Sequence, residues 1–102
     1  MENNKIYFYV APDEFAINCY RICESEDVKK VIGQNGFTNI CQARILGLNY
    51  PDYIKFCEKN YGGYASKSKN GFISPVIRFN NKTLAESLCL LLNKRWSEKF
   101  NG

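Results

Sequence analysis

The sequence predicts an α+β fold in a single globular domain over residues 1–102, with two β-hairpin–helix units that flank a central helical segment. Three observations predict it. Alternating apolar segments occur near both ends of the chain, a capped amphipathic helix follows each, and 45% of the residues are hydrophobic. The length of 102 residues is typical of one domain. We therefore expect a small, mainly antiparallel sheet packed by helices.

The first hairpin is expected within residues 5–35. The segment "KIYFYVA" (5–11) alternates and is rich in aromatic and β-branched residues, which favours a strand. "APDE" supplies a turn, and a second strand is expected over 15–23. The alternative is a helix that begins at Pro12, because proline followed by two acidic residues is also typical of a helix start.

A helix is expected directly after this hairpin. Ser25 can accept a hydrogen bond at the helix start, and Glu26 and Asp27 place negative charge in the first turn, where the helix dipole favours it. The apolar stripe of this helix consists of Val28, Val31 and Ile32. Gly33 and Gly36 are expected to end the helix.

The central segment contains one clear helix signal and one ambiguous stretch. Asn49 can cap a helix that has Pro51 in its first turn and Asp52 at the capping-box position. The side chains expected to face or flank the core are Tyr53, Ile54, Phe56, Cys57 and Tyr61. Residues 38–46 fit either a helix or a strand.

The second unit is expected over residues 63–100. "GYASKS" and "FISPVIRF" are strand-like segments joined at "KNG", where Asn70 and Gly71 can supply the positive φ angles of a tight turn. Pro75 cannot donate to a β-ladder, so the second strand is expected to be bulged or at an edge there.

The last helix is predicted from a capping box and a broad apolar face. Thr83 and Glu86 form the capping box. The apolar face consists of Leu84, Leu88, Leu91, Leu92 and Trp96. Leu90 points away from this face and is expected to be exposed, which indicates a contact with a partner or with a second copy of the chain.

The composition argues against an enzyme. The chain has no histidine, which removes the usual general base near neutral pH. Its five cysteines are odd in number and lack the C-x-x-C spacing of zinc sites, so we expect reduced thiols, with no metal and no cofactor. No apolar run is long enough to span a membrane, and the N-terminal segment does not resemble a signal peptide, which predicts a cytoplasmic protein.

The charge is distributed unevenly, and this asymmetry predicts a binding surface. Residues 1–27 contain two basic and six acidic residues, whereas residues 28–102 contain twelve and four. No acidic residue lies between Glu58 and Glu86. A surface of this kind suits a negatively charged partner. The candidate binding residues are Lys59, Tyr64, Lys67, Lys69, Arg78, Lys82 and Leu90. Tyr64 is included as an exposed aromatic side chain.

Two short segments suggest what the partner is. "LAESLCLLLNKRWSE" (84–98) resembles the final "A-E-x-L-C-x-L-L-N" helix of small phage and mobile-element proteins. This resemblance implies an accessory factor that binds and blocks a host protein or nucleoprotein complex, such as a defence nuclease. We therefore predict a small non-enzymatic binding protein, and a homodimer is compatible with it.

The alternative is a DNA- or RNA-binding domain. Read as two helices, residues 38–60 resemble a helix-turn-helix, with Ala43 at the helix crossing and Gly47 in the turn. The lysine-bearing hairpin over 63–79 would then contact phosphates. The second helix of the motif, however, carries acidic residues beside its lysines and no arginine.

Overall fold

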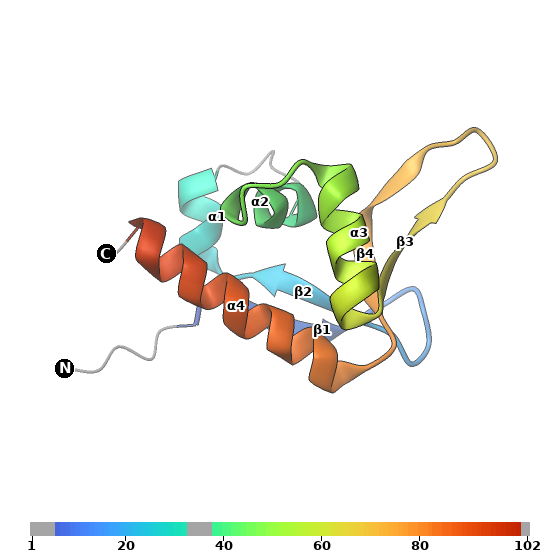
Figure 1. Cartoon of the computed structure of the whole chain (residues 1–102). Coiled ribbons are helices and arrows are strands. Elements are labelled where there is room, and N and C mark those ends of the chain that lie inside the picture. The colour runs from blue at the N-terminus through green and yellow to red at the C-terminus, as the bar shows by residue number, and fades with distance from the viewer. Residues whose placement is uncertain (1–5, 33–37, 101–102) are drawn as a thin grey trace.

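The computed structural model describes residues 6–32 and 38–100 and confirms the α+β fold. Two hairpin–helix units flank a central pair of helices, as predicted (Figure 1). In chain order, the elements are β1 (Phe8–Pro12), β2 (Tyr20–Glu24), α1 (Glu26–Ile32), α2 (Thr38–Ile45), α3 (Tyr50–Tyr61), β3 (Gly63–Lys67), β4 (Ile73–Phe79) and α4 (Lys82–Phe100).

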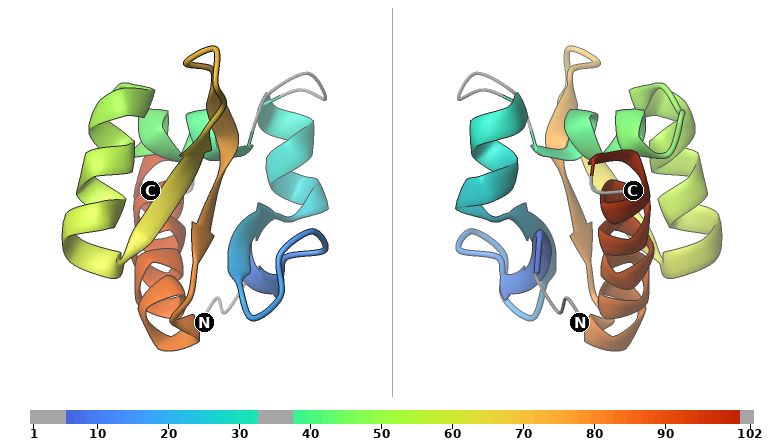
Figure 2. Two further views of the ribbon diagram at one scale, coloured as in Figure 1. Left: turned by 90° about the vertical axis from the view of Figure 1, so that its right-hand side faces the viewer. Right: turned by 90° about the vertical axis from the view of Figure 1, so that its left-hand side faces the viewer.

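The described strands form one antiparallel sheet with the order β1-β2-β4-β3. Each hairpin is paired along its length, but β2 and β4 are joined only where Tyr20 pairs with Phe79. Helices α2, α3 and α4 pack on one face of the sheet, whereas α1 contacts β2 near one end (Figures 1 and 2). The core therefore lies between the sheet and these three helices.

The core is built from alternate strand residues and one side of each covering helix. The largest apolar side chains in it are Phe8, Ile22, Tyr53, Ile77, Phe79, Leu88, Leu92 and Trp96. The ring of Trp96 lies edge-on to Phe8, with 5.9 Å between their centroids, and 6.1 Å from Tyr7. These contacts fix α4 against the edge strand β1.

The first hairpin differs from the prediction because its connecting loop is longer. The strand expected over 15–23 begins only at Tyr20, and the alternative helix at Pro12 is wrong. The backbone N–H of Asp13 donates to the carbonyl of Cys19 (2.9 Å), which closes a loop between the strands. Asn18 takes a left-handed conformation in this loop (φ 61°).

Helix α1 begins after Ser25, as predicted, but its apolar stripe is narrower than expected. Val28 is fully buried and Ile32 is partly buried, whereas 56% of Val31 is exposed. The reason is that α1 packs mainly against β2 and leaves one side open. The predicted helix end at Gly33 and Gly36 lies outside the described residues.

The ambiguous stretch 38–46 is a helix, α2, and it is joined to α3 by buried polar side chains. Asn49 caps α3 as predicted, because its Oδ1 accepts the N–H of Asp52 (2.8 Å). Within the core, the hydroxyl of Tyr53 donates to Oε1 of Gln42 (2.8 Å), and Nε2 of Gln42 donates to the carbonyl of Ile22 (3.2 Å). This chain of hydrogen bonds connects α3 through α2 to β2.

The second hairpin is bulged at Pro75, as predicted. Ala65 pairs with Ile77 and Lys67 pairs with Ile73, so residues 74–76 stand opposite Ser66 alone. The carbonyl groups within the bulge accept hydrogen bonds from two helix side chains. Asn39 Nδ2 donates to Pro75 O and Tyr50 OH donates to Ser74 O, both at 2.7 Å.

The turn of this hairpin differs from the prediction, because only one of its residues has a positive φ angle. The N–H of Gly71 donates to the carbonyl of Ser68 (3.0 Å), and Gly71 has a φ of 82°. Asn70 does not take a positive φ. A four-residue turn whose last residue is a left-handed glycine needs only one positive φ angle.

The residue that caps helix α4 lies two positions earlier than predicted. Oδ1 of Asn81 accepts the N–H of Leu84 (3.0 Å), so Asn81 is the cap and the expected Thr83–Glu86 capping box is wrong. The predicted apolar face is buried at Leu88, Leu92 and Trp96 and partly buried at Leu91, but Leu84 in the first turn is 36% exposed. Leu90 is 71% exposed, as predicted.

A close approach at Gly63 gives a first testable prediction. A Cβ atom at Gly63 would lie 2.6 Å from Cε2 of Phe79 and 3.0 Å from Cγ2 of Ile77. We expect Gly63→Ala to lower the free energy of unfolding by about 2 kcal/mol, measured by urea denaturation. In a Phe79→Leu background the same change should cost less, because the obstructing ring is gone. An equal cost in both backgrounds would show that Phe79 is not the obstacle.

Candidate interaction surface

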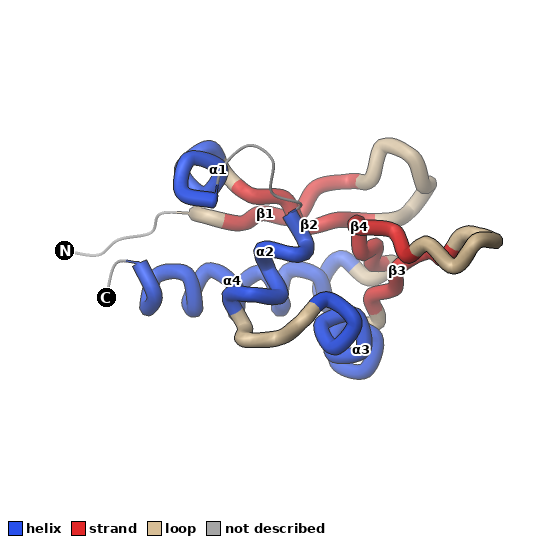
Figure 3. The backbone as a smooth tube through the Cα atoms, turned by 90° about the horizontal axis from the view of Figure 1, so that it is seen from above, coloured by secondary structure: helices blue, strands red, loops and turns tan. Residues whose placement is uncertain are grey.

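The predicted binding residues do not form one patch. Lys67 and Lys69 lie together at the β3–β4 hairpin, which projects from one end of the molecule (Figures 1 and 3). Lys59 is in the last turn of α3, and Lys82 is the first residue of α4. Leu90 lies in the middle of α4 and is 71% exposed. All five side chains are exposed, but they are divided among the hairpin, α3 and α4.

The prediction of Tyr64 and Arg78 as contact residues needs correction. They pair across β3 and β4, on the sheet face opposite the core, and both are only partly exposed. The Tyr64 hydroxyl lies 3.3 Å from Sγ of Cys19, and Nε of Arg78 donates to Oδ2 of Asp13 at 2.8 Å. Both side chains therefore hold the β1–β2 loop against the second hairpin and are not available as exposed contacts.

Asp13 is the centre of this connection. Its side chain is 1% exposed, its Oδ1 accepts the N–H of Phe15 (2.7 Å), and its Oδ2 receives Arg78. Burial alone would raise the pKa of this carboxyl, but the hydrogen bonds from Phe15 and Arg78 outweigh it, so the pKa lies below its ordinary value. Asp13 is therefore held as a carboxylate that positions the loop.

Cys19 makes a second connection at the other end of the same loop. Its Sγ–H donates to Oδ1 of Asn80 (3.2 Å), beyond the end of β4, and its Sγ contacts Tyr64. Because Asp13 and Cys19 are both tied to the second hairpin, the two ends of the loop are fixed. No local signal in the sequence identifies either residue as an anchor.

Three large apolar side chains protrude from the segments that these contacts hold. Phe15 and Ile17, in the β1–β2 loop, are 81% and 90% exposed, and Phe72, at the hairpin turn, is 67% exposed. Figures 1 and 3 show the loop and the hairpin extending from the same end of the molecule, and Figure 2 shows them apart across that end, with the hairpin tip at the top and the loop lower down. We call this end the loop–hairpin surface, which consists of Phe15, Ile17, Lys67, Lys69 and Phe72.

The charges on the exposed side of α3 do not favour the helix-turn-helix interpretation. The helix packs Tyr53, Ile54 and Cys57 into the core. Its exposed charged residues, two acidic and two basic, are Asp52, Lys55, Glu58 and Lys59. Such a balanced side offers no excess of positive charge to phosphates. The structure favours a packing role for α2 and α3.

Four of the five thiols are poorly suited to nucleophilic chemistry. Burial raises the pKa of Cys57 to about 12 and that of Cys89 to about 11, and it also raises the pKa of Cys23 and Cys41. A thiol with so high a pKa stays protonated at neutral pH, and the thiolate is the reactive form. All five cysteines are free, and the described residues contain no cluster of Cys, Asp and Glu that could hold a metal ion.

Comparisons with known proteins do not assign the chain to a family. No protein-family model, curated protein or solved structure matches it. Within the described ranges, no helix combines the length and the apolar character needed to cross a membrane. The exposed side chains are therefore the basis on which a function is inferred.

Proposed function

We propose that this chain is a small non-enzymatic binding protein that covers the surface of another macromolecule with its loop–hairpin surface. The partner is a host protein or nucleoprotein complex, of the kind that phage and mobile-element accessory factors block, including defence nucleases. The resemblance of residues 84–98 to the final helix of such factors supports this partner class. The proposal places the protein in the cytoplasm, where free cysteines are maintained.

The observation that carries the proposal is the exposure of Phe15, Ile17 and Phe72 on two protruding segments. Single exposed apolar side chains are common, but several at one end of a small protein are typical of an interaction site. The ion pair of Asp13 with Arg78 fixes the loop beforehand, which reduces the entropy lost on binding.

The two hairpin lysines define the charge of the preferred partner. Lys67 and Lys69 lie on the same hairpin as Phe72, in a stretch without acidic residues. Exposed charges at the rim of an interface mainly steer association and choose between partners. We therefore expect a partner surface that combines an apolar patch with acidic groups.

The same lysines support the alternative, direct binding of DNA or RNA. Phe72 could stack on a base while Lys67 and Lys69 neutralise phosphates, as in single-strand binding surfaces. This alternative predicts binding that weakens steeply with salt and depends more on the lysines than on Phe15 and Ile17.

A retention experiment distinguishes these functions. The wild-type chain and a Phe15→Ser, Ile17→Ser, Phe72→Ser variant are immobilised, and retained proteins from host extract are quantified. We expect at least about a tenfold loss of the bound protein in the variant, because exposed aromatic anchors dominate interface energies. Val31→Ser, which removes another exposed apolar side chain on α1, is the matched control and should retain it fully.

Two other results would count against the proposal. Equal retention by the wild type and the triple variant would exclude the loop–hairpin surface as the contact. Loss of binding in Lys67→Ala, Lys69→Ala, together with release of the bound material by nuclease, would establish the nucleic-acid alternative instead.

A further inference from the structure

The outer side of α4 carries an ordered stripe of exposed residues. At intervals of four residues they are Lys82, Glu86, Leu90, Lys94 and Glu98, and all five are exposed. Residues at this spacing form one ridge on a helix surface. Within the part of the chain that the structure describes, none of the four charged residues makes an ion pair.

The stripe is complementary to itself. Glu86 and Lys94 lie four residues on either side of Leu90, and Lys82 and Glu98 lie eight residues on either side. If a second α4 packs antiparallel, with a two-fold axis at Leu90, Glu86 faces Lys94 of the second copy and Lys82 faces Glu98. Each of these opposite-charge pairs then forms twice, as an isologous interface requires.

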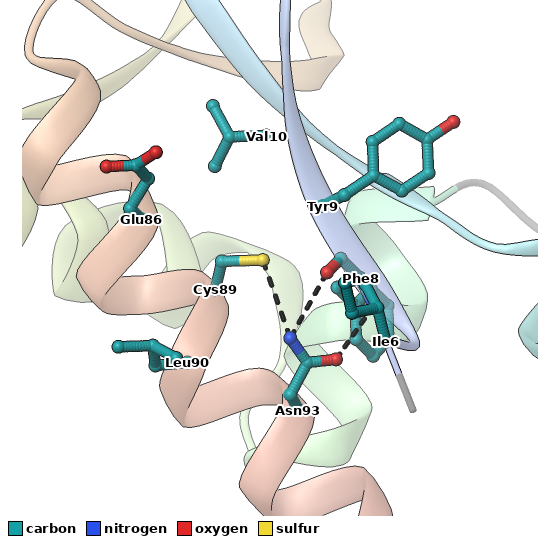
Figure 4. A pocket seen from close by; sticks show the side chains of 8 residues that line it. All are labelled: Ile6, Phe8, Tyr9, Val10, Glu86, Cys89, Leu90 and Asn93. Carbon is teal, nitrogen blue, oxygen red and sulfur yellow. Dashed lines mark hydrogen bonds between the residues drawn. The ribbon is translucent and has the colours of Figure 1, made fainter. Parts of the chain in front are cut away.

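An apolar groove of about 440 Å³ lies beside this stripe, between α4 and β1 (Figure 4). Ile6 on one side and Leu90 on the other are 63% and 71% exposed, and Cys89 lies between them and is buried. The Tyr9 ring points away from α4, on the other side of β1 (Figure 4). The same two-fold axis places Leu90 of a second copy beside Leu90, at the rim of this groove. The groove and the charged stripe therefore both fit a second copy of the chain.

A peptide strand is a poorer occupant of this groove. β1 is an edge strand, and an exposed edge can pair with an added strand. Here, however, Oδ1 of Asn93 accepts the N–H groups of Tyr7 (2.9 Å) and Phe8 (2.8 Å), and its Nδ2 donates to Phe8 O (3.1 Å) (Figure 4). Because Asn93 already uses these backbone groups, an added strand cannot pair with them.

We propose that the chain forms a symmetric homodimer through α4, in which Leu90 packs against Leu90 of the second copy at the rim of the α4–β1 groove and Glu86 pairs with Lys94 of that copy. This interface lies on α4 and β1 and leaves the loop–hairpin surface uncovered. The dimer therefore presents two such surfaces, and a partner with repeated sites gains affinity from both.

Sedimentation velocity on charge-reversed variants tests the dimer. We expect the wild type to dimerise in the micromolar range, and Glu86→Lys and Lys94→Glu each to weaken the dimer at least about tenfold, since each reversal creates two like-charge pairs. An equimolar mixture of the two variants should dimerise again, because both cross-pairs are then of opposite charge. Recovery on mixing cannot arise from misfolding of either variant.

Glu58→Lys, the same reversal on the exposed side of α3, is the matched control and should dimerise like the wild type. A wild-type chain that stays monomeric at millimolar concentration would overturn the proposal. So would a mixture of the two variants that associates no better than either alone.

Discussion

Replacing Asp13 with asparagine should lower the free energy of unfolding by about 3 kcal/mol, because the change leaves the Arg78 guanidinium beside a neutral group in a largely buried site. The side chains of Asp13 and Arg78 are 1% and 20% exposed, so water can only partly replace the lost partner. Urea denaturation at neutral pH measures the loss. Glu14→Gln, which neutralises the adjacent exposed carboxylate, is the matched control and should change stability little.

The effect of Asp13 should also depend on pH. Its pKa is lower in the folded protein than in the unfolded chain, where an aspartate has a pKa of about 4. The ionised carboxylate therefore stabilises the fold fully above that pH, and this contribution is lost as the pH falls through the lower, folded pKa. The stability gap between wild type and Asp13→Asn should narrow at pH 3. An unchanged gap would mean that the charge of Asp13 is not what stabilises the loop.

The same substitution should release the loop that carries Phe15 and Ile17. Asp13 accepts the N–H of Phe15 and anchors the loop to the second hairpin. Hydrogen exchange of the amides in residues 14–18 should become faster in Asp13→Asn under conditions in which the protein stays folded. Retention of the partner should fall as well, although no exposed apolar side chain has been changed.

Local sequence signals were sufficient for most elements of the fold. Ser25 and Asn49 precede α1 and α3 because short polar side chains satisfy the first free amides of a helix. Helix α2 was ambiguous for a physical reason. It buries Asn39 and Gln42, which are 2% and 1% exposed, so the pattern of apolar residues does not mark its inner side.

The candidate surface was predictable only in part. Lys67 and Lys69 could be placed on a hairpin because Gly71 marks the turn. The roles of Tyr64 and Arg78 could not be foreseen, since their partners Cys19 and Asp13 are 45 and 65 residues away in sequence.

Phe15 and Ile17 were missed because their alternation resembles a strand. Only the hydrogen bond from Asp13 N–H to Cys19 O, together with the left-handed Asn18, shows that these residues form a loop. A sequence records which side chains are charged or apolar, but tertiary contacts decide which of them remain exposed.

Asn93→Ala is the second substitution expected to have a large effect. One amide side chain satisfies three backbone groups, the N–H groups of Tyr7 and Phe8 and the carbonyl of Phe8. The site is partly buried, and each buried polar group left without a partner costs about 1–3 kcal/mol. Because water can reach part of the site, we expect a total loss of about 3 kcal/mol in the free energy of unfolding, measured by urea denaturation.

A control and a second readout make this prediction specific. Asn60→Ala removes an exposed asparagine whose Nδ2 donates to Phe56 O within α3 (3.0 Å), and it should change stability little. In Asn93→Ala, the amides of Tyr7 and Phe8 should exchange faster while those of β4 stay protected, since α4 no longer holds the start of β1. The unpaired edge of β1 also becomes available to an added strand, so this variant should aggregate more readily than Asn60→Ala. Equal stability and equal exchange in the two variants would show that Asn93 does not close the edge of the sheet.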